Sequence, residues 1–188
     1  MIKGRKIHRE EIKDIWAIDR REIIEQVYYL ENGTLVLKPE YYNMPGWPPG
    51  EAELYTPILE DCYDRGGWFY GLFDREKLIG VAVLDNHFIG KKEDRLQLKF
   101  LHISRPFRGR GWGKHLFELA VAEARKCGAQ SLYISATPSE NTIDFYLNLG
   151  CQVTNEVDPA LFALEPEDIH LEYNLELHRD KSERSENK

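Results

Sequence analysis

Residues 105–114 combine three glycines with four basic side chains, and a helix-like pattern begins directly after them. The first turn of a helix presents N–H groups that lack a partner within the helix, together with the positive end of the helix dipole. Glycines let an anion approach these N–H groups closely, and Arg108, Arg110 and Lys114 add full positive charges. The segment therefore predicts a phosphate-binding turn at the start of a helix.

Two common phosphate-binding motifs do not fit this spacing. A Walker loop needs a glycine five residues before its Gly-Lys pair and Ser or Thr after it, but Arg108 and His115 stand at those places. The dinucleotide fingerprint needs glycines at its first, third and sixth places, whereas here they are Gly109, Gly111 and Gly113. A glycine-rich surface turn with solvated arginines stays open as the alternative.

Length and composition indicate one globular domain with a real core. The chain has 188 residues, of which 42% are hydrophobic and 30% charged. We expect a single domain over residues 1–177 and a disordered polar tail over 178–188. Apolar runs are too short to cross a bilayer, and the N-terminus lacks the apolar centre of a signal peptide. We therefore expect a cytoplasmic protein that does not bind membranes.

The net charge of −7 argues against general nucleic-acid binding, which needs a basic face. It leaves room for one small basic pocket, and it suits a cationic substrate. The three cysteines are far apart and odd in number, so they fit neither a disulfide framework nor a zinc site. We expect free thiols and no bound metal.

Hydrophobic periodicity predicts a mixed α/β chain, with helices first, then a hairpin, then alternating strands and helices. The expected elements are a strand at 2–8, a helix at 10–18, further helical turns at 20–30, a helix at 51–63, strands at 68–73, 78–88 and 95–104, a helix at 111–126, a strand at 131–136, a helix at 140–149, and strands at 151–157 and 169–175. Residues 31–50 hold four prolines and are expected to be irregular. The alternation breaks at Phe100 and Leu101, which indicates a β-bulge or a strand buried on both faces.

Two linked motifs resemble the GNAT superfamily of acyl-CoA-dependent N-acyltransferases. Residues 108–113 match its Arg-x-x-Gly-x-Gly signature, which lies between the fourth strand and the third helix of that family. Ser139–Tyr146 followed by Leu149–Cys151 resembles its second motif, although Cys151 replaces the usual aromatic residue. The resemblance is strong over about residues 65–155 and rests on element order elsewhere.

The resemblance implies a GNAT-like fold, in which a mixed, mostly antiparallel sheet of about seven strands is flanked by helices and splayed between its fourth and fifth strands. It also implies acetyl-CoA as co-substrate, with the pyrophosphate on the glycine-rich turn and the pantetheine arm in the splay. The implied cofactor-binding residues are Leu101, His102, Ile103, Arg108, Gly109, Arg110, Gly111, Trp112, Gly113, Lys114 and Ser139. Ser139 is also a sound helix N-cap, and a structural role comes first for it.

The resemblance implies catalytic roles for two residues. The backbone N–H of Ile103 would stabilise the oxyanion of a tetrahedral intermediate, an effect worth about 3 kcal/mol in comparable sites. Tyr146 matches the tyrosine that commonly gives a proton to the departing thiolate in the family, and a phenol can do so within hydrogen-bond reach. The alternative for Tyr146 is a core tyrosine on an apolar helix face.

The general base is not readable from the sequence. Many family members carry a glutamate six residues before the position of Ile103, but Gln97 stands there and an amide cannot act as a base. Asp85, His87, His102 and a water chain stay open as candidates. Strand alternation is expected to turn His102 away from the cleft.

The acceptor is expected to be a primary amine. Residues 28–50 are rich in tyrosines and carboxylates, they cap the acceptor pocket in the family, and aromatics with carboxylates suit a cation. We expect a small-molecule amine first (a polyamine, an amino acid or an aminoglycoside-like antibiotic) and a protein or peptide amine second. A non-catalytic acyl-CoA-binding sensor is the third reading. Exposed edge strands leave a homodimer open.

Overall fold

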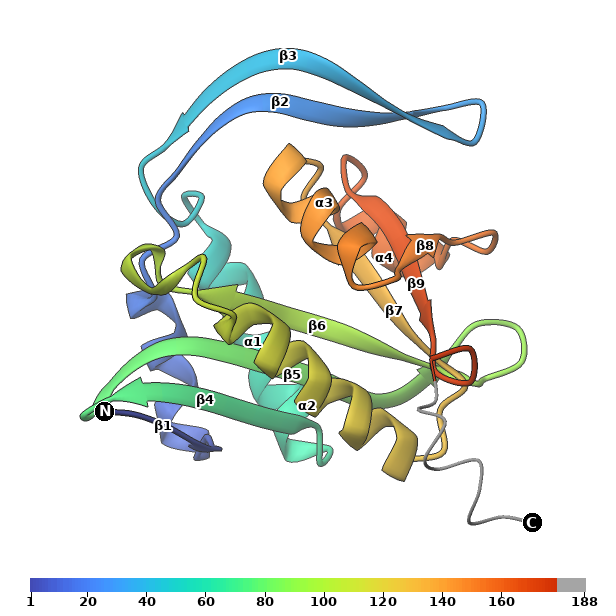
Figure 1. Ribbon diagram of the computed structural model, residues 1–188. Coiled ribbons are helices and arrows are strands. Elements are labelled where there is room, and N and C mark those ends of the chain that lie inside the picture. The colour runs from blue at the N-terminus through green and yellow to red at the C-terminus, as the bar shows by residue number, and fades with distance from the viewer. Residues whose placement is uncertain (179–188) are drawn as a thin grey trace.

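The structure is a computed structural model that describes residues 1–178, and it is built around one mixed sheet (Figure 1). Over these residues the sheet has seven strands, in the spatial order β1-β4-β5-β6-β7-β9-β8. The strands are β1 (Ile2–Lys6), β4 (Trp68–Asp74), β5 (Lys77–Ile89), β6 (Arg95–Ile103), β7 (Ser131–Ala136), β9 (Ile169–Asn174) and β8 (Gln152–Val153). Neighbouring strands run antiparallel except for β6 and β7. The predicted mostly antiparallel α/β sheet of about seven strands is confirmed.

The parallel pair of β6 and β7 holds together at one end. Its register runs from Arg95 opposite Ser131 to Gln97 opposite Tyr133. Beyond that point the two strands diverge, as Figure 1 shows, and no further pair joins them within the described residues. This divergence is the predicted splay, because β6 and β7 are the fourth and fifth strands across the sheet.

The break in alternation near Phe100 is a β-bulge in β6. Val83 pairs with Phe100 while Leu84 pairs with Leu98, which leaves Lys99 as an extra residue in β6. A bulge bends its strand and increases the local twist. The bend lies between the paired start of β6 and its separated end, so it helps to turn that end away from β7.

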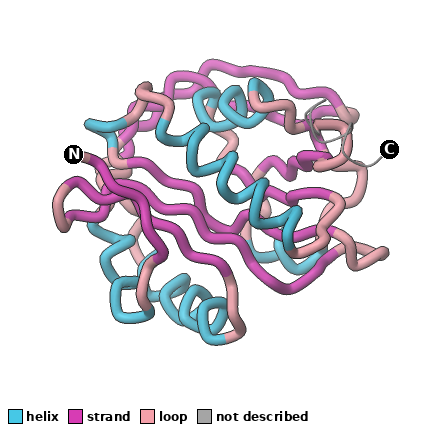
Figure 2. Tube along the Cα trace, turned by 60° about the horizontal axis from the view of Figure 1, so that its bottom comes forward, coloured by secondary structure: helices cyan, strands magenta, loops and turns pink. Residues whose placement is uncertain are grey.

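Helices cover both faces of the sheet (Figure 2). On one face lie α1 (Glu51–Asp64) and the 3₁₀ helix η1 (Arg9–Ala17), which share a core cluster with β4, β5 and β6. On the other face α2 (Trp112–Lys126) and α3 (Glu140–Asn148) pack against the sheet through a second set of buried apolar side chains. The residues of the glycine-rich turn and of the second motif therefore share one face.

Residues 22–44 form a two-stranded arm that extends beyond the main sheet (Figure 1). The arm pairs β2 (Glu22–Glu31) with β3 (Thr34–Met44), so the predicted helical turns at 20–30 and the predicted irregular stretch are wrong there. Its turn is Asn32-Gly33, both with positive φ (50° and 79°), as two-residue hairpin turns favour. Pro39 is tolerated within β3 because both strands of a two-stranded sheet are edge strands.

Smaller differences lie at the two ends of the chain. The predicted helix at 10–18 is the 3₁₀ helix η1, and the last part of the domain contains an unpredicted short helix, α4 (Pro159–Leu164). The strand predicted at 151–157 is the two-residue β8. The tail at 179–188 lies outside the described residues. The three cysteines are free thiols, as expected.

Among the described residues, no helix has the length and apolar character needed to cross a membrane.

The buried face of α2 should carry a large share of the folding free energy. Leu116→Ala is expected to lower the free energy of unfolding by about 2–5 kcal/mol, because the Leu116 side chain is fully buried between α2 and the sheet. Leu54→Ala on α1 is the matched control, since that side chain is half exposed and its loss should cost under about 0.5 kcal/mol. Urea denaturation followed by circular dichroism measures both, and equal losses would contradict this account of the core.

Candidate active site

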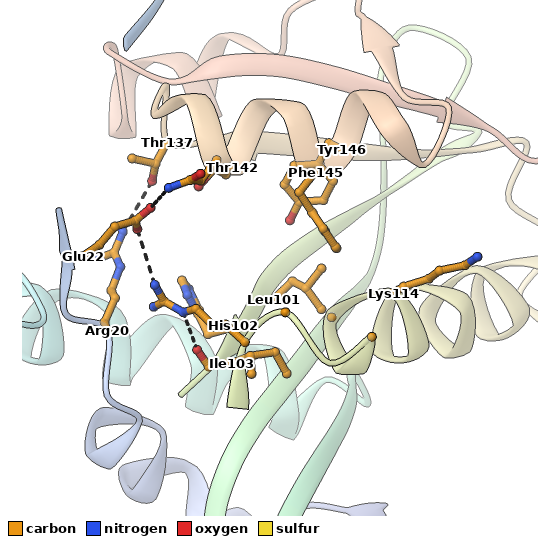
Figure 3. A pocket seen from close by; sticks show the side chains of 15 residues that line it. Arg20, Glu22, Leu101, His102, Ile103, Lys114, Thr137, Thr142, Phe145 and Tyr146 are labelled. Atoms are coloured by element: carbon orange, nitrogen blue, oxygen red, sulfur yellow. Dashed lines mark hydrogen bonds and ion pairs between the residues drawn. The ribbon is translucent and has the colours of Figure 1, made fainter. Parts of the chain in front are cut away.

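A cavity of about 680 Å³ opens where β6 and β7 part (Figure 3). Its walls come from the end of β6, the glycine-rich loop and first turn of α2, the residue after β7, one side of α3, and Arg20 and Glu22 at the start of the arm. The lining residues are Arg20, Glu22, Leu101, His102, Ile103, Arg108, Gly109, Gly111, Gly113, Lys114, Thr137, Asn141, Thr142, Phe145 and Tyr146. Nine of the twelve predicted site residues are therefore brought together in one cavity.

Arg110, Trp112 and Ser139 are the predicted site residues that do not line this cavity. The exposed Arg110 lies over the ring of Phe107, and Trp112 is half-buried next to the core cluster around α2. Ser139 is buried, and its hydroxyl donates a hydrogen bond to Thr142 Oγ1 at 2.9 Å. It occupies the N-cap position of α3, but its side chain makes no capping hydrogen bond to the helix backbone.

The glycine-rich turn forms an open cradle at the N-terminus of α2. Gly109 and Gly111 have φ values of 71° and 82°, which strongly favour glycine. No described atom lies within 4 Å of the position that a Cβ would take at either residue. The N–H of His115 donates to Gly111 O, so the N–H groups of residues 112–114 precede the helical ladder of α2. This geometry suits an anion of phosphate size.

Arg108 connects this cradle to the end of β6. Its Nε donates to Ile103 O at 2.9 Å, and its guanidinium lies 3.7 Å from the carboxylate of Glu22. Burial lowers the pKa of Arg108, and the charges of Arg20 and Arg105 act in the same direction. The guanidinium therefore fixes the loop to the strand while it contributes positive charge to the cavity wall.

The backbone of Ile103 faces the gap between β6 and β7. Hydrogen-bonded and non-hydrogen-bonded pairs alternate along an antiparallel ladder. The N–H of Ser104 donates to Ile79 O, so the next residue pair, Ile103 with Gly80, is a non-hydrogen-bonded one. The N–H and C=O of Ile103 consequently point away from β5 and toward the gap, and Arg108 takes the carbonyl.

Tyr146 and Phe145 point from α3 toward β6 (Figure 3). Only 6% of Tyr146 is exposed, and burial raises the pKa of its hydroxyl, so the phenol stays protonated at neutral pH. A Cβ added at Gly113 would lie 3.2 Å from the ring of Phe145, so α2 and α3 approach each other closely beside the cradle. Phe145 belongs to the second sequence motif, but its place in the cavity wall was not predicted.

Arg20 and Glu22 line the cavity and were missed by sequence reasoning. Arg20 donates to both carboxylate oxygens of Glu51 at 3.0 Å and lies 3.4 Å from Thr137 Oγ1. Glu22 accepts a hydrogen bond from Asn141 Nδ2 at 3.1 Å. The available signal was the charged run at residues 19–22, which the helical interpretation of residues 20–30 did not connect with a site.

His102 does line the cavity, contrary to the expectation that alternation turns it away. Its ring packs edge-on against Trp47 and Phe100, with centroids 4.8 Å and 5.3 Å away. Burial lowers the pKa of His102 well below its usual 6.5, and the charges of Arg20 and Arg108 lower it further. The imidazole is therefore neutral at pH 7, and its protonation is unfavourable.

A second cavity of about 530 Å³ lies between the arm and the C-terminal part of the domain. The arm supplies Tyr28, Tyr29, Tyr42 and Glu40 to its wall, so part of the tyrosine-rich and carboxylate-rich segment lines a cavity. Thr137, directly after β7, lines both cavities, so the two are neighbours at the end of β7. A backbone hydrogen bond from Tyr28 N–H to Pro138 O holds the arm over this junction.

A model of the acetyltransferase (GNAT) family matches residues 26–151, which is well over half of the chain. The chain belongs to the GNAT acetyltransferase family. No curated protein matched the sequence.

Solved structures with the same fold are numerous and distant in sequence. Nourseothricin acetyltransferase is 18% identical with a TM-score of 0.68, and the match covers 93% of this chain and 98% of that one. A putative streptothricin acetyltransferase from Bacillus anthracis, solved with acetyl coenzyme A, is 14% identical with a TM-score of 0.63, covering 93% and 99%. The ribosomal-protein-S18-alanine N-acetyltransferase from Escherichia coli is 12% identical with a TM-score of 0.58, covering 93% and 94%.

The other base candidates of this GNAT domain lie outside the cavity. Asp85 is held by Arg65 and Lys99 at 3.1 Å each, and Gln97 accepts from the same lysine at 2.9 Å. Burial alone would raise the pKa of Asp85, but its two cationic partners outweigh that effect and lower the pKa to about 2. The remaining candidate, His87, is exposed.

Asp85 is accordingly expected to act in stability and not in proton transfer. Asp85→Asn should reduce the free energy of unfolding by about 2 kcal/mol at pH 7, which corresponds to the lowered pKa of this carboxyl. Because the folded-state pKa is below that of the unfolded chain, the difference should be complete above about pH 5 and shrink toward pH 2.

Urea denaturation at pH 7 and at pH 3 measures this difference. Asp74→Asn is the control, because that carboxylate is 41% exposed and lies 3.6 Å from its partner, the N-terminal amine. If Asp85→Asn loses turnover while its free energy of unfolding is unchanged, Asp85 is again a candidate for the general base.

Proposed function

We propose that the chain transfers the acetyl group of acetyl-CoA to a primary amine of a small molecule, by direct attack within a ternary complex. The observation that carries the proposal is one cavity that joins the α2 cradle, the Ile103 N–H and the Tyr146 hydroxyl. Distant structural relatives solved with acetyl coenzyme A or coenzyme A support the choice of donor.

The donor is assigned to the cavity by its shape and charge. The pyrophosphate would rest on the N–H groups around Gly111 and Gly113, where the open space and the helix dipole favour an anion. The pantetheine arm would follow the separated end of β6, whose backbone groups at Leu101 and Ile103 face the gap. The thioester would then lie between Ile103 and Tyr146.

The residues of the cavity match the needs of acyl transfer. The amine nitrogen bonds to the thioester carbon, the Ile103 N–H stabilises the oxyanion, and the carbon–sulfur bond breaks. An alkylammonium must lose one proton before it attacks and a second as the amide forms. Tyr146 gives its proton to the thiolate and recovers one from the nitrogen, so that one proton in total is released.

A small acceptor is favoured by the arm. The second cavity is closed on one side by β2 and β3, and its volume is in the range of small-molecule sites. Tyrosines and carboxylates in its wall suit an ammonium group. Two distant relatives are named as nourseothricin and streptothricin acetyltransferases, which agrees with a small acceptor. A third is named as a ribosomal-protein-S18-alanine N-acetyltransferase, so a peptide amine stays the alternative acceptor.

An acetyl-CoA turnover assay tests the proposal by detecting free thiol against a panel of amines. The panel contains spermidine, lysine, kanamycin, nourseothricin and a peptide with an N-terminal alanine. Tyr146→Phe runs alongside and is expected to lower kcat by about 100-fold while it leaves acetyl-CoA affinity unchanged, since a positioned proton donor contributes about that much.

Thiol release with only the peptide would replace the small acceptor with a protein amine. Binding of acetyl-CoA without release from any amine would indicate a sensor. Unchanged kcat in Tyr146→Phe would remove this residue from proton transfer.

The cradle gives a second prediction, with a matched control at the other end of α2. Gly111→Ala and Gly128→Ala both place a methyl at a left-handed residue (φ of 82° and 84°) with open space around it, and each should cost about 1–2 kcal/mol of stability. Only Gly111→Ala is expected to weaken acetyl-CoA binding, by about tenfold or more, because its methyl group displaces phosphate from the N–H groups.

Isothermal titration calorimetry with acetyl-CoA measures both variants. Equal acetyl-CoA affinities of the two variants would show that the glycine-rich turn does not bind the phosphates.

A further inference from the structure

Asp168 is a carboxylate that none of the steps above uses, and it lies at the junction of the two cavities. It directly precedes β9, one residue beyond the last pair of the β7–β9 ladder, Ala136 with Ile169. Asp168 lines the second cavity beside Thr137, which also lines the first. Its Oδ2 accepts a hydrogen bond from Ser135 Oγ at 2.9 Å.

The surroundings of Asp168 favour proton uptake. Burial raises the pKa of this carboxyl to about 6, and the nearby charges of Glu165 and Glu51 act in the same direction, against the Ser135 hydrogen bond and the charge of Arg20. Glu51 accepts hydrogen bonds from Arg20 through both carboxylate oxygens, and this pairing weakens the effect by which the charge of Arg20 lowers the pKa of Asp168.

Most of the other ionisable groups around Asp168 have hydrogen-bond partners of their own. Tyr55 of α1 donates to Glu165, while Glu40 of the arm accepts from Tyr29 and Tyr42. His170 of β9 is hydrogen-bonded through Nδ1 to the Tyr133 hydroxyl at 2.7 Å. Glu167 lines the same cavity.

Asp168 also interacts with the proposed proton donor. Its negative charge is one of the causes that raise the pKa of Tyr146, so the two groups lie within electrostatic reach of each other. Tyr146 lines the first cavity and Asp168 lines the second. A thioester in the first cavity would thus have the acid in its own wall and the carboxylate in the wall of the neighbouring cavity.

Two other groups near the gap, His102 and Glu51, are poorer proton acceptors. Protonation of His102 would add a cation beside Arg20 and Arg108 in a buried place. Protonation of Glu51 would break its two bonds to Arg20. Asp168 alone among these groups gains a proton without losing a cationic partner at ion-pair distance.

We propose that Asp168 is the general base of the reaction, and that the acceptor is a primary alkylammonium that enters through the second cavity. This inference rests on the proposed function. One N–H bond of the ammonium breaks, its proton goes to the carboxylate of Asp168, and the electron pair left on nitrogen forms the bond to the thioester carbon. Asp168 then releases the proton to solvent through the cavity beneath the arm.

The test compares Asp168→Asn with wild type in kcat/KM for the best amine of the panel, between pH 5 and pH 10. The wild-type profile is expected to fall below about pH 6, where free Asp168 becomes protonated. The variant is expected to lose about 100-fold at pH 7, the usual contribution of a general base, and to recover as pH approaches about 10, where the amine itself deprotonates.

Asp158→Asn is the matched control, because it removes the same charge close to His170, keeps a good N-cap for α4 and lies outside both cavities. It should follow the wild-type profile.

Melting temperature separates a structural role from a catalytic one. The raised pKa means that ionised Asp168 destabilises the folded chain at neutral pH, so Asp168→Asn should melt no lower than wild type.

Two results would overturn the assignment while the proposed function stands. The first is a kcat/KM of Asp168→Asn that lies within twofold of wild type at pH 7. The second is a loss of kcat/KM that is the same at every pH, together with a lower melting temperature. Wild-type protein that releases thiol with no amine would overturn the proposed function, and this inference with it.

Discussion

The short pairing between β6 and β7 is the constraint on which the rest of the structure depends. Beyond Gln97 the end of β6 loses its neighbour in β7, and unpaired backbone groups inside a protein must find other partners. The bulge at Lys99 turns the strand, and Arg108 takes the carbonyl of Ile103. Tyr146 and Phe145 of α3 line the space that opens. The cavity thus follows from an interrupted ladder.

The sequence predicts the main sheet and its helices well, because periodic segments with buried faces dominate there. It fails over residues 22–44. Ile23, Ile24 and Val27 have a spacing that fits a helix, but they lie in an arm strand where Ile23 stays half exposed. With little burial, periodicity carries little information, and the Asn-Gly turn was the better signal.

The residues of the candidate site also differ in how well the sequence predicts them. The glycine-rich turn and Tyr146 belong to contiguous motifs, so the resemblance to a known family points to them without a structure. Arg20 lines the first cavity and Asp168 the second, and each stands next to a segment without a motif of its own. Their positions depend on which strands part and which loops meet, and only tertiary structure supplies that information.

The hydrogen bond from Arg108 to the carbonyl of Ile103 fixes the distance between the cradle at the start of α2 and the N–H that faces the gap. A donor held at both places must have a fixed reach from its pyrophosphate to its carbonyl. Under the proposed function, the protein therefore measures the length of its thioester, and truncated thioesters that lack the nucleotide end can occupy only one of the two anchor points.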